Sequence, residues 1–137
     1  MRKLLVTGGS GYIGSYITKM AAATRTNTQV YVLSRQKAED VYKKCPDLRQ
    51  FKNVEIVQGD CLEKQSLPRE VLKEVDGVIH CVGTLFEGGN YKSENPLQNL
   101  QIIANSFYRK TDRASPLSYE SLNRDSCINL ALVLNEL

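Results

Sequence analysis

A glycine-rich segment close to the N-terminus constrains the fold of this chain more than any other feature. Residues 7–14 read TGGSGYIG; they follow a short apolar run at 3–7 and precede apolar residues at helical spacing. The segment matches GxGxxG from Gly9 and GxxGxxG from Gly8. Between a strand and a helix, such glycines permit a tight turn and let the main chain approach a pyrophosphate. The segment therefore predicts a phosphate-binding turn; the alternative is a structural turn that binds nothing.

Strand-like and helix-like segments alternate over the first 82 residues. Apolar runs with the length of buried strands are followed by segments with helical spacing or helix-terminating prolines. This alternation predicts β-α-β units, and hence an α/β fold with a Rossmann-type, doubly wound parallel sheet. The expected strands span 3–7, 29–34, 54–57 and 77–82, and the expected helices span 13–23, 38–45 and 68–74.

The last third of the chain departs from this alternation. Gly88-Gly89 indicates a turn, residues 95–107 predict a helix, and Ser115 or Ser118 is expected to cap a last helix that runs to Leu137. A doubly wound domain usually has further strands beyond the fourth. We therefore expect residues 1–137 to form one NAD(P)-binding Rossmann domain, truncated after strand four and its following helix, with the catalytic portion absent. An open, apolar fourth strand would favour self-association.

Composition excludes several classes of function. The chain has 137 residues and a net charge of +3 without a Lys/Arg stripe, so we expect no nucleic-acid partner. Its apolar runs are too short for a transmembrane segment, and strand-like residues follow Met1-Arg2-Lys3 directly, so no secretory leader is expected. Four cysteines without a CxxC pair, and one histidine, predict no metal site. We expect reduced, mostly buried thiols and a reducing compartment.

A second indicator of ligand type lies at the end of the second predicted strand, at Ser34-Arg35, with Lys37 nearby. Rossmann folds that prefer NAD place Asp or Glu about 20 residues beyond the glycines, where it accepts from the ribose hydroxyls. Here there is no carboxylate, and a guanidinium can bind a 2′-phosphate through paired charge-assisted hydrogen bonds. The pattern favours NADP(H), with NAD(H) as the alternative. A further alternative is that Arg35 is a solvated loop charge with no role in binding.

The ends of the third and fourth predicted strands add further candidates. The Asp60 carboxylate could accept from an adenine amino group, or could form a capping box with Glu63. Gly83 lets the backbone lie against the adenosine half of a ligand. His80 is expected to be a packed or hydrogen-bonded histidine rather than an acid–base group.

With these motifs in register, the chain resembles the extended and atypical short-chain dehydrogenase/reductase superfamily. Residues 80–87 (HCVGTLFE) and 118–126 (SYESLNRDS) are similar to a narrower branch. That branch includes a fungal mitochondrial protein associated with the coenzyme Q biosynthesis complex and is similar to the accessory NADPH-binding subunit of respiratory complex I. The resemblance covers essentially the whole chain. It implies a mitochondrial location (otherwise the cytoplasm) and a ubiquinone-related protein complex as partner.

The resemblance also implies contacts to a dinucleotide, position by position. The predicted cofactor-binding residues are Gly8, Gly11, Tyr12, Ile13, Gly14, Ser34, Arg35, Asp60, Cys61, Val82 and Gly83.

Catalysis in the superfamily uses a Ser or Thr after strand five and a Tyr-x-x-x-Lys pair, in which the lysine lowers the tyrosine pKa. This chain has no Tyr-x-x-x-Lys, and Tyr119 is followed four residues on by Asn123. We therefore assign no catalytic residue and expect a non-catalytic or weakly catalytic subunit linked to ubiquinone biosynthesis or respiratory complex assembly. The alternatives are the N-terminal cofactor-binding half of an NADP-dependent oxidoreductase or epimerase-type enzyme, and a truncated product that folds poorly.

Overall fold

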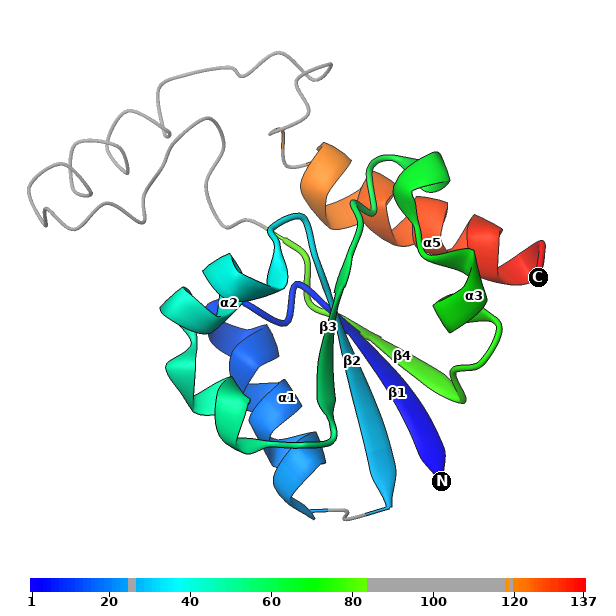
Figure 1. The fold of residues 1–137 in the computed structure, drawn as a ribbon. Coiled ribbons are helices and arrows are strands. Elements are labelled where there is room, and N and C mark those ends of the chain that lie inside the picture. Colours follow the sequence, from blue (N-terminus) through cyan, green and yellow to red (C-terminus); the bar gives the residue numbers. More distant parts are fainter. Residues whose placement is uncertain (25–26, 84–117, 119) are drawn as a thin grey trace, which may run out of the picture.

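A parallel four-stranded sheet forms the centre of the molecule (Figure 1). The computed structural model describes residues 1–24, 27–83, 118 and 120–137. The strands lie in the order β3-β2-β1-β4, so the first two connections step outward in one direction and the chain then crosses to the other side of β1. This is the Rossmann-type sheet that the sequence predicts. The strands are β1 (Arg2–Thr7), β2 (Thr28–Ser34), β3 (Val54–Gln58) and β4 (Gly77–His80).

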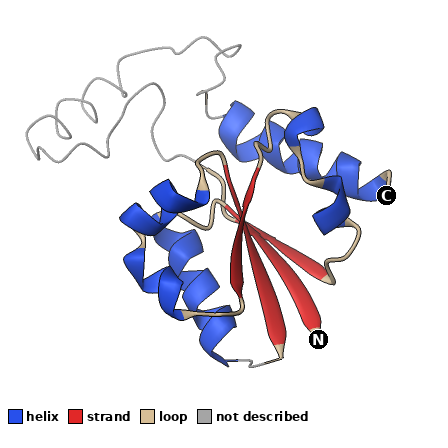
Figure 2. Ribbon diagram, in the orientation of Figure 1, coloured by secondary structure: helices blue, strands red, loops and turns tan. Residues whose placement is uncertain are grey.

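Helices cover both faces of the sheet (Figure 2). Helices α1 and α2 lie on one face, and α3 and α5 lie on the other. Short 3₁₀ turns follow α2 and precede α3, and a π-helical turn at Ser121–Asp125 leads directly into α5. The helices are α1 (Tyr12–Thr24), α2 (Ala38–Lys44), α3 (Arg69–Leu72) and α5 (Ser126–Asn135).

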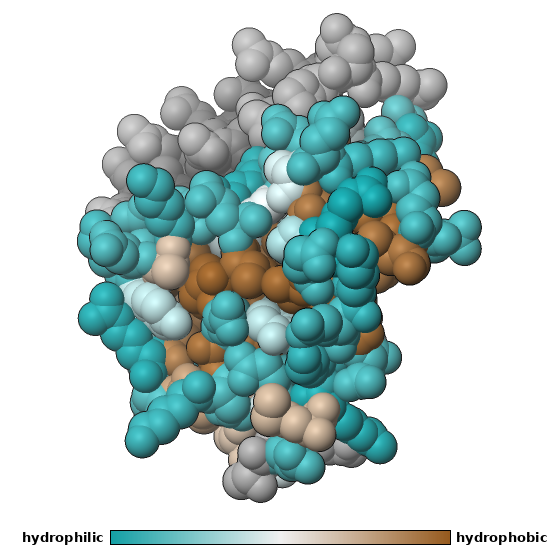
Figure 3. All heavy atoms as spheres, turned by 45° about the vertical axis from the view of Figure 1, so that its right-hand side comes forward, coloured by the Kyte–Doolittle hydropathy of each residue, from teal (hydrophilic) through white to brown (hydrophobic). Residues whose placement is uncertain are grey.

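Two apolar clusters, one on each face, hold the layers together. Side chains alternate along a strand, so neighbours in β1 serve different faces: Leu5 packs toward α3 and α5, whereas Val6 packs toward α1. Helix α5 contributes Leu130 and Val133 to the first cluster, and both are almost completely buried. In the view of Figure 3 the surface is mostly polar, with apolar residues near its middle and on its right-hand side.

Strand β4 is shorter than the sequence predicts. It ends at His80, not at Val82, because its partner β1 ends at Thr7, where Gly8 takes a positive φ and turns the chain away. One further backbone contact, from the Cys81 amide to the Thr7 carbonyl at 3.0 Å, keeps the two strand ends together. The loop residues that follow β1 and β4 therefore stay in contact.

Other predictions agree with the structure to different degrees. Helix α2 ends before Pro46, as expected, whereas Pro68 precedes α3 and does not form its first residue. All four cysteines are free, but of these only Cys61 is buried and Cys127 is exposed, so the expectation of mostly buried thiols was wrong. The predicted turn at 88–89 and helix at 95–107 lie outside the described residues. Within the described part of the chain, no helix has the length and apolar character needed to cross a membrane.

Candidate dinucleotide site

The glycine-rich turn is packed too tightly to admit side chains at three of its positions, Gly8, Gly9 and Gly14; a Cβ on Gly9 would lie 2.6 Å from Cγ1 of Val32. Gly8 has φ +66°, and a Cβ placed on it would lie 2.8 Å from the Cys81 carbonyl oxygen. A Cβ on Gly14 would lie 2.2 Å from the Gly8 carbonyl oxygen. These contacts bring the turn against the end of β4 and the start of α1 against the turn. Gly8 stays partly exposed, whereas Gly9 and Gly14 are buried.

Gly11 differs from its neighbours in what surrounds it. Among the described residues other than its chain neighbours, a Cβ there would meet one atom within 4 Å, the Gly8 carbonyl oxygen, at a tight 3.1 Å. Gly11 precedes α1, and its carbonyl accepts the first helical hydrogen bond, from the Ser15 amide at 2.9 Å. Apart from this one contact, the described residues leave the space beside Gly11 open.

The start of α1 presents main-chain donors to that space. Among the described residues, none accepts a hydrogen bond from the amides of Tyr12, Ile13 or Gly14. The Tyr12 and Ile13 side chains are 93% and 65% exposed, so they leave the helix end uncovered. Free amides together with the positive end of the helix dipole form an anion-binding arrangement. The geometry fits a pyrophosphate.

The end of β2 adds a cation at the same edge of the sheet. Ser34 is buried, and its hydroxyl accepts from the Gln36 amide at 3.1 Å, which fixes the turn that follows the strand. Arg35 is exposed, and no described residue forms an ion pair or hydrogen bond with its guanidinium. Because its main-chain carbonyl accepts from Gln58 at 3.3 Å, the backbone is held while the charged group stays available.

The end of β3 forms a compact turn in place of the predicted capping box. The Asp60 carboxylate accepts from the Leu62 amide at 2.9 Å, while the Asp60 amide donates to the Ser66 hydroxyl at 2.8 Å. No α-helix starts at this point, so Glu63 has no reciprocal capping role. Burial raises the pKa of the Cys61 thiol to about 12, which keeps it protonated and unreactive at neutral pH. Cys61 is therefore a packing residue beneath the turn.

Beyond the end of β4, a residue that the sequence analysis did not select lies close to Gly83. A Cβ on Gly83 would lie 2.5 Å from Oδ1 of Asn123, which belongs to the π-helical turn before α5. The sequence contains no signal for this contact, because the two residues are far apart in the chain and a π-turn has no recognised residue pattern. Val82 and Gly83 thus lie between the glycine-rich turn and the π-turn.

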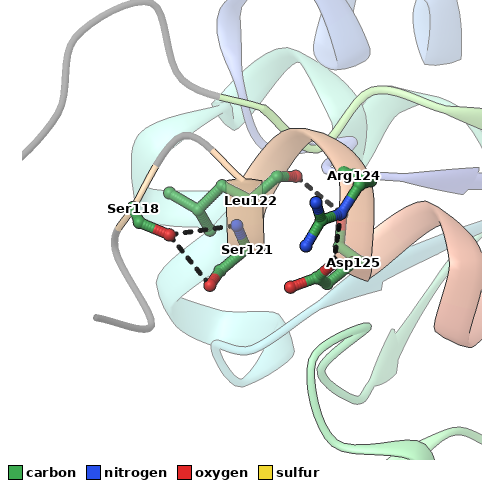
Figure 4. Close-up of polar contacts among 6 residues, drawn as sticks. Ser118, Ser121, Leu122, Arg124 and Asp125 are labelled. Carbon is green, nitrogen blue, oxygen red and sulfur yellow. Dashed lines mark hydrogen bonds and ion pairs between the residues drawn. The ribbon is translucent and has the colours of Figure 1, made fainter. Parts of the chain in front are cut away.

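The π-helical turn is anchored at its start by serines (Figure 4). The Ser118 hydroxyl accepts from the Ser121 amide at 3.1 Å and donates to the Ser121 hydroxyl at 3.0 Å. Ser118, one of the two predicted caps, therefore takes that role. Arg124 and Asp125 form an ion pair on the exposed side of the turn.

His80, the last residue of β4, is partly buried, and each of its ring nitrogens has a hydrogen-bond partner. Its ring bonds to Thr7 on one side and to Ser126 on the other, and burial lowers its pKa. This agrees with the prediction of a hydrogen-bonded histidine.

All predicted cofactor residues thus lie at the carboxyl ends of β1, β2, β3 and β4, on the loops that follow them, or at the start of α1. In parallel α/β sheets this edge is where ligands bind. An apolar hollow of about 530 Å³ lies elsewhere, against Leu4, Met20 and Gly77, and is not continuous with these residues.

Comparison with protein families identifies the family of this chain. Residues 1–105 match the NmrA-like family. The chain belongs to the NmrA-like family. The match includes the glycine-rich turn, Arg35, Asp60 and the end of β4. Together with its relatives, this NmrA-like chain is placed among NAD(P)-binding, oxidoreductase-like Rossmann proteins.

Relatives of this NmrA-like chain are longer proteins. The chain is 29% identical over 136 residues to MIOREX complex component 2 of Saccharomyces cerevisiae, covering 94% of this chain and 48% of that protein. It is 36% identical over 85 residues to an isoflavone reductase-like protein of Olea europaea, covering 61% of this chain and 27% of that protein. The chain thus spans half or less of the length of these relatives.

Solved structures show the same fold. A complex of Pseudomonas aeruginosa RhlG with NADP aligns with a TM-score of 0.59 at 19% identity, over 99% of this chain and 47% of that one. A short-chain dehydrogenase/reductase of Saccharomyces cerevisiae aligns with a TM-score of 0.60 at 21% identity, over 99% of this chain and 48% of that one. These alignments show the fold. Together with the NmrA-like match and the isoflavone reductase-like relative, they confirm the predicted resemblance to the short-chain dehydrogenase/reductase superfamily.

Proposed function

We propose that this chain binds a nicotinamide dinucleotide at the carboxyl edge of its sheet, with the pyrophosphate on the amides that begin α1. The observation that carries the proposal is that main-chain amides without an acceptor lie beside open space. The amides of Tyr12, Ile13 and Gly14 have no acceptor among the described residues, and Gly11 beside them meets one protein atom. Main-chain donors at a helix start bind phosphate without a charged side chain.

We further propose NADP(H) as the preferred form. Arg35 follows β2 at the position where NAD-preferring folds carry a carboxylate, and no described residue neutralises it. A 2′-phosphate would gain charge-assisted hydrogen bonds from the guanidinium, which a ribose hydroxyl would not match. RhlG, which shares the fold, was crystallised with NADP. Its likeness supports the ligand class, while Arg35 supports the 2′-phosphate.

The Arg35→Glu variant tests this preference. The wild-type chain is expected to bind NADPH more tightly than NADH, and the substitution is expected to reduce that ratio by roughly tenfold or more, because hydrogen bonds to charged groups contribute about 1.5–3 kcal/mol. Calorimetric titration of both nucleotides measures the two dissociation constants.

Lys52→Glu is the matched control for this experiment. It makes the same change of charge at an exposed position that precedes β3, at the opposite edge of the sheet. The control should leave the ratio within twofold of wild type. An unchanged ratio in Arg35→Glu, with both nucleotides still bound, would refute the preference for NADP(H).

For the biological role, we propose a non-catalytic or weakly catalytic subunit of a larger assembly connected with ubiquinone biosynthesis or respiratory complexes, located in mitochondria. The similarity over 94% of this chain to a component of the yeast MIOREX complex favours an assembly role. This chain supplies no Tyr-x-x-x-Lys pair, so the proposal assigns it dinucleotide binding and no catalytic residue.

The second candidate is the cofactor-binding half of an NADP-dependent oxidoreductase. The reductase names of the plant relatives favour it. Both readings need the same dinucleotide site and differ in whether the bound nucleotide is consumed. Mass spectrometry of nucleotide that co-purifies with the chain identifies the ligand in either case.

A further inference from the structure

A directional chain of hydrogen bonds crosses the interior between β1, β4 and the π-helical turn. His80 Nδ1 lies 2.8 Å from the Thr7 hydroxyl, and His80 Nε2 lies 3.0 Å from the Ser126 hydroxyl. The Ser126 hydroxyl in turn donates to the Leu122 carbonyl at 2.6 Å. Thr7 and Ser126 are fully buried, so water does not replace these partners.

The available hydroxyl and ring protons determine which group donates in each bond of this hydrogen-bond chain. Ser126 has one hydroxyl proton, which it gives to Leu122, so its oxygen accepts from His80 and Nε2 carries the ring proton. Nδ1 is then unprotonated and accepts from the Thr7 hydroxyl, whose oxygen accepts from the Cys81 amide at 3.3 Å. The ring is neutral in this arrangement, and burial lowers its pKa in agreement.

The π-turn explains why Ser126 must supply this hydroxyl. In an α-helix the Ser126 amide would bond to the Leu122 carbonyl, four residues back. Here it bonds to the Ser121 carbonyl, five residues back. The Ser126 side chain satisfies the Leu122 carbonyl instead, and His80 fixes that side chain. The irregular turn is thereby joined to the sheet through one imidazole.

Both ends of this hydrogen-bond chain adjoin the dinucleotide site. Thr7 immediately precedes Gly8, whose turn rests on the Cys81 carbonyl. At the other end, the π-turn holds Asn123 over Gly83. A shift of the imidazole would therefore move the glycine-rich turn and the π-turn relative to each other.

We propose that His80 is a positioning residue for the dinucleotide site: its neutral ring, protonated at Nε2, links Thr7 to Ser126 and so fixes the spacing between the glycine-rich turn and the π-turn. This inference rests on the proposed function, since it concerns the same site. It assigns His80 no contact with the nucleotide.

The test compares NADPH dissociation constants of His80→Leu, Ser126→Ala and the double variant, at a temperature where circular dichroism shows each to be folded. Each single change is expected to weaken NADPH binding about three- to tenfold, the range of one buried hydrogen bond. The double variant should bind NADPH no more weakly than the single variant with the lower affinity, because the two residues act through one contact. His80→Gln, whose amide N–H can still donate to Ser126, should recover part of the loss.

Val133→Ala is the matched control. It removes buried methyl groups from α5, in the apolar cluster between the sheet and α5, and leaves the side chains of His80 and Ser126 unchanged. It should lower stability and leave NADPH affinity within twofold of wild type. An unchanged affinity in folded His80→Leu, or an equal loss in Val133→Ala, would overturn the inference. Wild-type chain that binds no NADPH would instead overturn the proposed function, and this inference with it.

A measurement on wild type alone covers the case in which the variants do not fold. His80 is the one histidine in the sequence, so its ring ¹⁵N resonances are unambiguous in NMR spectra. At neutral pH these shifts should report the neutral tautomer protonated at Nε2. The opposite tautomer, or a charged ring, would contradict the hydrogen-bond chain and overturn the proposal.

Discussion

At the scale of single residues, the glycines of the turn serve different purposes. Gly14 is required by packing, because a Cβ there would lie 2.2 Å from main-chain oxygen. Gly11 is not required in the same way, since its Cβ would approach one atom, at 3.1 Å. The motif in the sequence shows the glycines as equivalent, whereas the structure separates those that build the turn from the one that leaves room beside it.

This difference predicts losses of stability of unequal size for two alanine substitutions. Gly14→Ala should lower the free energy of unfolding by about 1–3 kcal/mol, as overpacking against a rigid backbone does, in spite of the better helix propensity of alanine. Gly11→Ala, at the helix cap, should cost less than about 1 kcal/mol. Urea unfolding followed by circular dichroism measures both. Equal losses in the two variants would show that packing demands glycine at both positions.

At the scale of elements, the two edges of the described sheet are unlike. Edge strand β3 carries an exposed glutamate, Glu55, whereas β4 consists of Gly77, Val78, Ile79 and His80 and has no charge. Charged residues on an edge strand discourage pairing with another chain. Self-association through β4 stays a prediction, and the absence of charge on its described residues is the observation that motivates a test.

Ile79→Lys tests this difference between the edges. Ile79 pairs with Val6 and is partly exposed, so a lysine there can reach solvent while placing a charge on the edge. Sedimentation velocity at rising concentration should show association of the wild-type chain and a shift toward monomer in Ile79→Lys. Glu55→Lys, which changes charge on the other edge, should associate as wild type does. Identical behaviour of all three chains would exclude β4 as the contact.

At the scale of the whole molecule, the sequence predicts the sheet and the site edge because both depend on local patterns. Apolar runs identify the strands, and the glycine-rich turn and Arg35 lie where those strands end. The sequence does not predict the early end of β4, which is set by its neighbour β1, or the π-turn that brings Asn123 to Gly83. The link from His80 to Ser126 likewise joins residues 46 positions apart, and no local pattern encodes it.

The central claim is that main-chain amides at the start of α1 hold a dinucleotide pyrophosphate beside Gly11. Calorimetric titration of NADPH into the wild-type chain and into Gly11→Val tests it most directly, with circular dichroism to verify that both are folded. We predict one bound nucleotide per wild-type chain and at least about tenfold weaker binding to Gly11→Val, because the valine side chain occupies the space that the phosphate needs. A folded wild-type chain without NADPH binding, or a folded Gly11→Val with undiminished affinity, would contradict the claim.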